Sequence, residues 1–510
     1  MDSIFWGVVL RLAQVIIFSA PWVAAGFVIA GVFRVMIGPS RTRAMFGGSG
    51  WAGLLAGWVW GMLLPVCSLG VIPVVLELRK SGVRGGTLIA FALTAPLFNP
   101  LSLLYGLTLS DPLAIIAFAG CSLLIVGLVG LLWDWIFPDT SPPPEASEPE
   151  VAFGIKRMIA VFRASTEMIY GPATLLILVG IIGSVAVSIV IPHGALSTML
   201  ERENILAPAM VAGIATPVYS TPLLAMSQIG SMFQHGNSIG AAFTLLIFGA
   251  GINLGLLALF IRVYGVRQLG VFLLLLAVTG IGLAYTISEP LFPEGIEVAG
   301  HTHAFDVYTR PYMTGTPDLP RKTWEKIVEH WGNHEFGGVP ILAGMIVLGG
   351  VFLVLDRITG LRNWLRAPSG RHRVDRVLPT GVVAASAIIG LVALSIVGCY
   401  VYYPPKAQTL SEMRAFNAEV ALSAKTGNWD GALKWIAFQE DLARRLEIGT
   451  FIRSGELGEY HRTKARIFRE NLELLRHALE DRNQAEADRL AMQTDQAFRR
   501  MSRAFLRDGN

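Results

Sequence analysis

The chain is short of charged residues and almost lacks cysteine. Only 15% of its 510 residues are charged, against about 25% in ordinary soluble domains. This shortage excludes a large soluble enzyme and a disordered scaffold. The three cysteines are too few for a disulfide framework. A net charge of +4 gives no reason to expect nucleic-acid binding. The sequence contains no catalytic constellation, so we expect no enzyme.

Long apolar runs take the place of the missing charge. The mean hydropathy of +0.55 requires many lipid-buried spans. Residues 1–10 lack the basic start of a cleaved signal, so the first run is expected to be retained. Eight runs have about the 20 residues that a bilayer demands: 12–36, 86–107, 112–136, 168–191, 240–261, 270–287, 339–355 and 379–402. The sequence predicts an all-α, multi-pass protein of a bacterial inner membrane.

Two further apolar stretches, 51–78 and 204–233, are interrupted by prolines and glycines. Their limbs of roughly 8 to 14 residues are too short to cross the bilayer alone. Each stretch is either one broken crossing helix or a re-entrant hairpin. Arg41 before the first stretch and Arg79 and Arg84 after it indicate cytoplasmic flanks on both sides, which favours hairpins.

Loop charge and composition divide the chain into six regions. The hairpin topology places the C-terminal bundle outside the cytoplasm. The regions are a first permease repeat (1–137), a cytoplasmic Pro/Glu/Ser linker (138–157), a second repeat (158–287), an external histidine-containing loop (288–338), two further transmembrane helices (339–402) and an external, periplasmic helical bundle (403–510).

The two halves share a spacing pattern. Glycine, glycine and asparagine recur at intervals of four and thirteen: Gly82, Gly86 and Asn99 in the first half, Gly236, Gly240 and Asn253 in the second. Three spans plus a hairpin make an odd number of crossings, so the second copy is expected to be inverted. Inverted repeats with interrupted segments at matching positions point to a secondary transporter with a midplane site. A duplicated structural bundle without transport is the alternative.

The interruptions supply the candidate substrate pathway. Unwound backbone is tolerated at membrane depth only beside protein or a water-filled cavity. The two hairpin tips carry Cys67 and Ser68, and Tyr219 and Ser220. Asn99 and Asn253 mark a second pair of breaks, where an amide can hold the backbone or a substrate. The same asparagines could equally be interhelical bonding residues.

One stretch resembles a known family. Residues 65–82 read PVCSLGVIPVVLELRKSG, and residues 95–104 read APLFNPLSLL. Both resemble the bacterial predicted-permease family of the ArsP and YraQ type, over roughly residues 12–287. The resemblance implies a duplicated inner-membrane permease that exports a small solute, with organoarsenicals as the substrates of family efflux members. It places the family's implicated cysteine at Cys67, although Leu69 stands where many relatives have a second cysteine.

Two residues in or beside this stretch keep alternative interpretations. Thiolates select soft ions, so Cys67 is a candidate ligand for a metalloid, but a lone buried cysteine commonly acts as a small hydrophobic residue. Glu77 is an intramembrane carboxylate and therefore a candidate proton-coupling group. Its neighbours Arg79 and Lys80 favour an interfacial ion pair instead.

The external loop holds a second candidate site. Its ligand-type residues are His301, His303, Asp306, His330 and His334. The H-x-H and H-x3-H spacings could supply three or four ligands to zinc or copper, or the histidines could bond backbone groups. No other cofactor is expected.

We expect a secondary permease that exports a small solute, such as a metalloid, organoarsenical or metal species, by alternating access around the two tips. The partners would be this solute, the lipid bilayer and a periplasmic protein on the C-terminal bundle. A membrane-anchored metal-sensing or assembly protein, working through the histidine loop and the tail, is the alternative.

Overall fold

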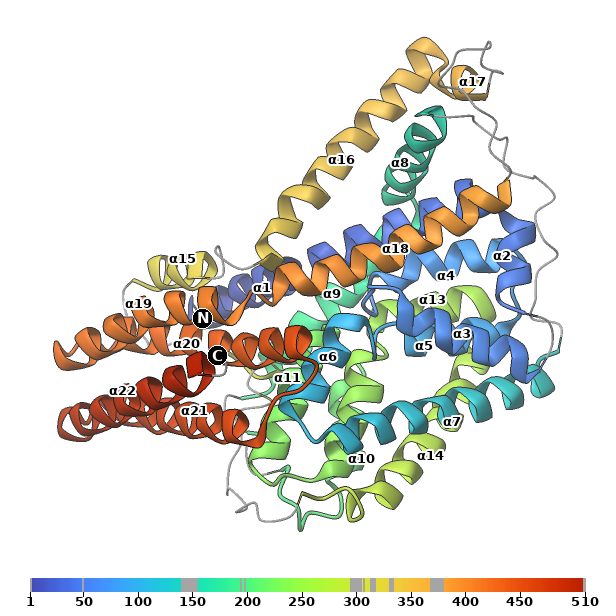
Figure 1. The fold of residues 1–510 in the computed structure, drawn as a ribbon. Helices are drawn as coiled ribbons and strands as arrows, with labels where there is room; N and C mark the ends of the chain where they lie inside the picture. The colour runs from blue at the N-terminus through green and yellow to red at the C-terminus, as the bar shows by residue number, and fades with distance from the viewer. Residues whose placement is uncertain are drawn as a thin grey trace. The chain divides into compact units, whose positions relative to one another are not determined.

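The computed structural model describes residues 2–47, 50–138, 155–192, 195–196, 199–293, 305, 308–311, 318–329, 334–366 and 380–507. Every regular element among these residues is a helix (Figure 1). The chain divides into two compact units. The first unit comprises Met1–Gly106 and Ser110–Ser395, and the second comprises Leu107–Leu109 and Ile396–Asn510.

The first half of the first unit begins with a long helix that carries Pro21 and ends in a π-helical turn. Shorter helices follow, separated by proline- and glycine-containing breaks. The elements are α1 (Asp2–Val32), η1 (Phe33–Ile37), α2 (Pro39–Met45), α3 (Trp51–Leu63), α4 (Val71–Lys80), α5 (Gly85–Thr94), α6 (Pro100–Leu109) and α7 (Pro112–Ile136).

The second half also places short helices between longer ones. Its elements are α8 (Ile155–Ile169), α9 (Pro172–Val190), α10 (Ala207–Ala215), α11 (Pro222–Gln234), α12 (Ile239–Thr244), η2 (Leu245–Ala250), α13 (Leu254–Tyr264) and α14 (Val266–Ser288). The remaining helices before the tail are α15 (Leu319–Glu329), α16 (His334–Thr359), α17 (Leu361–Arg366) and α18 (Thr380–Tyr402).

Six helices among the described residues are long and apolar enough to cross a membrane, which confirms a multi-pass membrane protein. The α12–η2 and α13 pair, bent by 59°, would make a seventh. The eight expected spans are thus too many as continuous helices. The run 86–107 is two helices, α5 and α6, because the chain unwinds before Pro100, whose missing N–H suits the first turn of a new helix.

The two halves also share a tertiary contact. The Gly86 N–H at the start of α5 donates to Asp134 Oδ1 on α7 (2.7 Å), and the Gly240 N–H at the start of α12 donates to Ser288 Oγ on α14 (3.3 Å). Both pairs are 48 residues apart. Each bond satisfies an N–H in the first turn of a helix, which has no partner within that helix.

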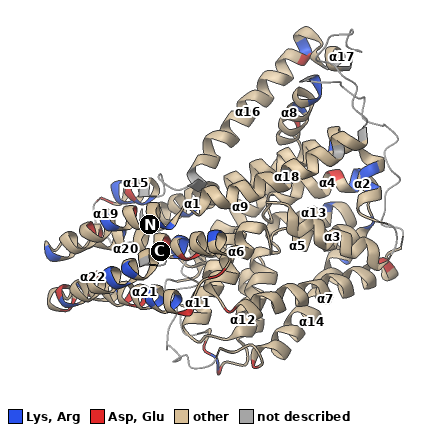
Figure 2. Ribbon diagram, viewed as in Figure 1, with Lys and Arg blue, Asp and Glu red and all other residues tan. Residues whose placement is uncertain are grey.

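Basic residues of the first unit lie on α2, at the end of α4 and on α8, and a separate group lies on α15 (Figure 2). The Arg79 guanidinium of α4 donates to the Val263 carbonyl at the end of α13 (3.0 Å). Arg163 on α8 pairs with Asp356 at the end of α16. Segments whose charge predicts a cytoplasmic location are therefore neighbours in the structure.

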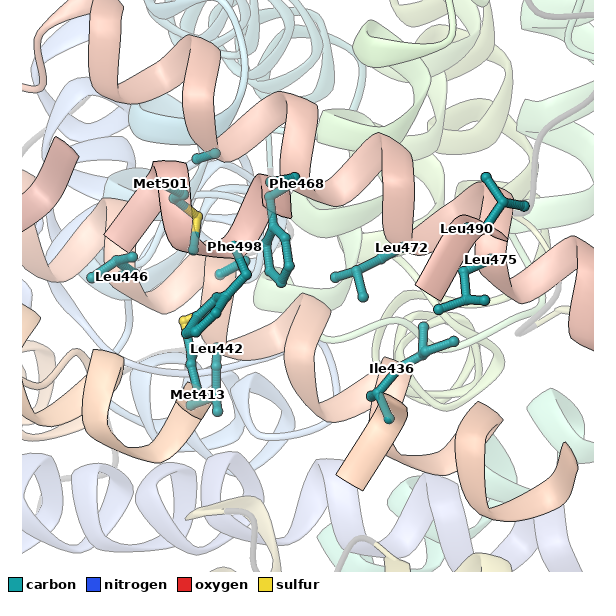
Figure 3. Packing of buried hydrophobic residues seen from close by; sticks show 14 of the residues in the cluster. Met413, Ile436, Leu442, Leu446, Phe468, Leu472, Leu475, Leu490, Phe498 and Met501 are labelled. Atoms are coloured by element: carbon teal, nitrogen blue, oxygen red, sulfur yellow. The ribbon is translucent and has the colours of Figure 1, made fainter. Parts of the chain in front are cut away.

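Four amphipathic helices form the tail bundle: α19 (Lys406–Lys425), α20 (Trp429–Ser454), α21 (Glu459–Glu480) and α22 (Gln484–Arg507). α19 and α21 each pack against both α20 and α22. Their apolar faces enclose one core, with Met413, Leu446, Phe468, Phe498 and Met501 among its residues (Figure 3). Because the apolar residues gather in this core and most charged residues of the four helices are exposed or half-buried, the bundle has the pattern of a water-soluble domain.

Candidate functional site

The first tip is a tight turn between α3 and α4. Cys67 is fully buried, and its sulfur accepts the Gly70 N–H at 3.3 Å. Its carbonyl accepts the Val71 N–H at 2.8 Å, which begins α4. The neighbouring Ser68 is also fully buried, and its hydroxyl has no hydrogen-bond partner among the described residues. A buried hydroxyl left in this state is costly unless something else bonds it.

The second tip meets the first. Thr221 caps α11 by accepting the Leu224 N–H (3.1 Å), and the Tyr219 N–H donates to Ser184 Oγ on α9 (3.1 Å). The Tyr219 side chain lies near the Cys67 thiol. Two turns more than 150 residues apart in the sequence therefore share one buried location.

Glycines allow long helices to approach these breaks. A Cβ placed on Gly26 of α1 would lie 2.0 Å from the Gly70 carbonyl oxygen of the first tip. In the second half, a Cβ on Gly255 of α13 would lie 2.3 Å from the Leu176 carbonyl oxygen of α9. Neither distance admits a side chain, so each close backbone approach requires glycine.

Asn99 and Asn253 occupy equivalent positions. Each is fully buried and caps the helix that follows its break. Asn99 Oδ1 accepts the Ser102 N–H (2.8 Å), and Asn253 Oδ1 accepts the Leu256 N–H (3.0 Å). In both residues the amide Nδ2 has no hydrogen-bond partner among the described residues. Each asparagine therefore uses its Oδ1 to cap a helix, while its Nδ2 remains a buried donor.

Contacts bring the breaks of the two halves together. A Cβ on Gly251 would lie 3.2 Å from the Leu97 side chain, so the segment before Asn99 packs against the segment before Asn253. A Cβ on Gly180 of α9 would lie 2.5 Å from the Leu69 side chain and 2.9 Å from Asn253 Oδ1. The first tip thus lies beside the second asparagine.

A small cavity adjoins the second tip. Its volume is about 30 Å³, the room of roughly one water molecule. Arg11, Gln14, Ser184, Ser188, Tyr219 and Thr221 contribute to its lining. Val15, Phe18, Val218 and Leu224 also line it, so the cavity is partly apolar, and Asn99 and Asn253 are not among its lining residues.

Glu77 is not at the tips. It is buried near the C-terminal end of α4, where its carboxylate accepts a charge-assisted hydrogen bond from Lys80 at 2.8 Å. This contact matches the ion-pair interpretation of Glu77, with Lys80 rather than Arg79 as its partner.

The proposed metal ligands His301, His303, Asp306 and His330 lie outside the described residues, and His334 is described only as the first residue of α16. Among the described residues, no group of three or more metal-ligating side chains could hold a metal ion.

Sequence reasoning missed one segment that reaches the site. Within the loop between α14 and α15, Phe305, Tyr308 and Thr309 are buried, and the Tyr308 side chain is hydrogen-bonded to Ser220 of the second tip. These residues lie between stretches of ordinary polar composition, so neither hydrophobic length nor charge marks them.

Helices interrupted inside a multi-pass unit are typical of membrane transporters. The family model of a predicted permease matches residues 7–289, more than half of the chain, and the chain belongs to this predicted-permease family of the ArsP type. This match confirms the family that the sequence motifs resemble.

Two relatives agree with this assignment. The chain is 23% identical over 279 residues to the UPF0718 protein YcgR of Bacillus subtilis (strain 168), covering 53% of this chain and 92% of that protein. It is 28% identical over 90 residues to a candidate subunit of a two-component membrane permease complex from Streptococcus mutans serotype c, covering 18% of this chain and 30% of that protein. No solved structure matches the chain.

Proposed function

We propose that the chain is a secondary permease that exports a small solute by alternating access around the two tips. The observation that carries this proposal is the pair of buried asparagines, each of which caps a helix and retains an unpaired amide donor. The proximity of Cys67 and Tyr219, which brings the tips of the two halves together, also supports the proposal. In secondary transporters, substrates bind between repeats where helices are interrupted.

The chemistry of the site favours acceptor oxygens on the solute. Asn99 and Asn253 offer N–H donors at the N-termini of α6 and α13, where the helix dipoles also favour negative charge. The hydroxyl of Ser68 can donate from the first tip. A solute that binds two or three of these groups would satisfy donors that are otherwise buried without partners.

Serine substitutions test this role, because serine caps a helix about as well as asparagine but lacks the amide donor. We expect Asn99→Ser and Asn253→Ser to insert normally and to lose most transport into everted vesicles screened across metalloids and divalent metals. Asn99→Leu and Asn253→Leu should also abolish transport, with an added stability cost of about 1–3 kcal/mol for the unpaired groups they leave.

A purely structural role for the asparagines gives the opposite result. In that case the serine variants would transport like the original protein, and only the leucine variants would fail. A cysteine pair at positions 99 and 253 that resists a short bifunctional crosslinker would further contradict a shared cavity.

The metalloid part of the proposal rests on Cys67 at the first tip. Cys67→Ser preserves an acceptor for the Gly70 N–H but removes the soft sulfur. We expect it to lower resistance of cells to trivalent arsenicals at unchanged protein abundance. Cys121→Ser, on α7, is the matched control and should leave resistance unchanged. Equal resistance in cells carrying the original protein, Cys67→Ser or Cys121→Ser would show that Cys67 is not part of the site.

We further propose a bacterial inner-membrane location with the tail bundle outside the cytoplasm. The contacts of Arg79 with the end of α13 and of Arg163 with the end of α16 bring the segments expected in the cytoplasm together, which supports this orientation. In a cysteine-free background, an impermeant thiol reagent added outside should label Tyr460→Cys on α21 and not Arg84→Cys before α5. Labelling of position 84 alone would reverse the topology.

The tail bundle is proposed as a docking module for a partner protein. The S. mutans relative is named for a two-component complex, which makes a second subunit a reasonable expectation for this chain. Its soluble-type amphipathic helices support a protein partner rather than a further membrane span.

A further inference from the structure

A groove of about 760 Å³ lies on the tail bundle and is lined by residues of α19 and α22. The two helices contribute stripes of the same spacing. The lining residues recur at i, i+3, i+4, i+7, i+8 and i+11, counted from Arg414 on α19 and from Asp495 on α22. A stripe of this period is the face that one helix presents to another. The groove therefore offers two helical faces to a further helix.

Part of the lining is apolar. Ala418 and Ala421 on α19 are small and leave room beside the ring of Phe498 on α22. Leu422 and Leu506 also line the groove, and they are 59% and 45% exposed. Apolar side chains that are exposed together in a concave surface are typical of interaction sites, unlike single leucines scattered over a surface. A ligand with an apolar side would cover them.

The charged residues of the lining are one carboxylate, that of Asp495, and four cations: Arg414, Lys425, Arg499 and Arg503. The carboxylate is already bonded by Asn417 Nδ2 and by Arg499, each at 2.9 Å. Arg414, Lys425 and Arg503 are exposed, and none of them pairs with a carboxylate in the described part of the chain. An excess of cations at a surface attracts a partner of negative charge.

Ser502 gives a second, independent indication of a ligand. It lines the groove from α22, is only 7% exposed, and its hydroxyl has no hydrogen-bond partner among the described residues. Buried hydroxyl groups are normally hydrogen-bonded. A carboxylate or amide of a bound partner would supply the bond.

We propose that this groove binds an amphipathic helix of a partner protein, with an apolar stripe on one side and Asp or Glu residues on its flanks. The stripe would contact Leu422 and Leu506, and the acidic flanks would pair with Arg414 and Arg503. Amphipathic helices commonly bind to other proteins in grooves of matching chemistry. The inference rests on the proposed docking role of the tail bundle, and it specifies where the partner binds and what it carries.

An anionic lipid surface is the competing ligand for the same cations. Lipid headgroups would contact the exposed arginines but would not use the lining that Phe498 and Ser502 provide, because both residues are buried. An inserted helix side chain can use both parts of the groove, so the groove favours a helix.

A labelled peptide tests the groove on the full-length protein in phosphatidylcholine nanodiscs, with empty nanodiscs as the blank. The probe is a peptide of roughly 20 residues with leucines at i, i+3, i+4 and i+7 and glutamates beside them. We expect fluorescence anisotropy to show binding that weakens as salt is added, and no binding of a version with lysine in place of glutamate. Arg414→Glu with Arg503→Glu should weaken binding by about 10-fold or more. Arg500→Glu is the matched control, because Arg500 is exposed on α22 but does not line the groove.

The apolar part of the groove has its own variant. Leu422→Ala should weaken binding of the glutamate peptide by about 3–10-fold. Leu474→Ala is the control, because Leu474 on α21 is 53% exposed and lies outside the lining. Equal binding to the original protein and to the double glutamate variant would overturn the proposal. If no peptide binds, and phosphatidylglycerol nanodiscs alone protect α19 and α22 from hydrogen exchange, the groove is a lipid site and the proposal is wrong.

Photo-crosslinking in cells separates this inference from the docking role on which it rests. A crosslinking residue is introduced at position 421 in the groove or at position 474 outside it. Protein adducts at position 421 that the glutamate peptide displaces would support the groove. Adducts at position 474 alone would leave the docking role intact and overturn the groove, and adducts at neither position would overturn both.

Discussion

The centre of the first unit and the core of the tail bundle bury different kinds of polar groups. The tail bundle joins its helices with charged pairs: Arg469 on α21 with Glu447 on α20, and Arg476 with Glu440. At the described tips and asparagine breaks, the buried polar groups are neutral amides, hydroxyls and a thiol. Several of them, including Asn99 Nδ2 and Asn253 Nδ2, have no bonding partner among the described residues.

Under the proposed function, this difference separates a region built for stability from one built for exchange. A buried ion pair binds its two helices strongly because loss of either partner leaves a charge without compensation. An unpaired buried neutral donor costs less free energy than an unpaired buried charge, and it can donate a transient hydrogen bond to a solute or water. Under the proposed function, the neutral groups at the tips and breaks would bind solute, whereas the ion pairs of the tail bundle fix one arrangement of its helices.

The largest expected effect is in the tail bundle. Arg469→Ala leaves the Glu447 carboxylate buried without its cation, which should destabilise the bundle by about 3–5 kcal/mol. Hydrogen exchange of the full-length protein in detergent should show faster exchange of α20 and α21 amides.

Arg466→Ala provides the control for this comparison. Arg466 pairs with Glu470 one turn away on the same helix, and both side chains are more than half exposed. Such pairs contribute about 0–1 kcal/mol. Equal exchange in the two variants would show that burial of the Arg469 pair does not matter.

A smaller effect is expected at the backbone contact between α1 and the first tip. Gly26→Ala places a methyl group where the Gly70 carbonyl oxygen already lies, so α1 must move away. We expect a loss of about 1–3 kcal/mol in thermal unfolding of the purified protein, together with reduced transport. Gly120→Ala on α7 meets no atom within 4 Å and should be neutral or slightly stabilising. If both variants behave alike, the close approach has no functional role.

Sequence periodicity and hydropathy predicted much of the fold. The tail is helical, as expected for residues 403–510. The length of the apolar run 86–107 predicted a single span, which was wrong, because length does not indicate where the backbone unwinds. The break before Pro100 separates two helices of 10 residues each. The amphipathic helices α8 and α15 were also missed, since neither is apolar enough to signal a span.

The candidate site was only partly visible in the sequence. Tip position and spacing identified Cys67, Tyr219 and the two asparagines, because a repeat leaves a pattern in residue numbers. Tyr308 left no such pattern, since it is a single aromatic residue in a polar loop with no counterpart in the other half. Its position depends on long-range contacts with Gln228 and Ser220 that local composition does not encode.

The smallest expected effects compare the two halves directly. The Gly86 N–H bonds a carboxylate, whereas the equivalent Gly240 N–H bonds a hydroxyl at a longer distance. Charge-assisted hydrogen bonds are about twice as strong as neutral ones. Asp134→Ala should therefore lower stability by about 1–2 kcal/mol, and Ser288→Ala by about 0.5 kcal/mol, in thermal unfolding. Asp134→Asn keeps an acceptor for the Gly86 N–H and should recover much of the loss. A larger loss for Ser288→Ala than for Asp134→Ala would mean that the two contacts, though equally spaced in sequence, do not serve as equivalent helix caps.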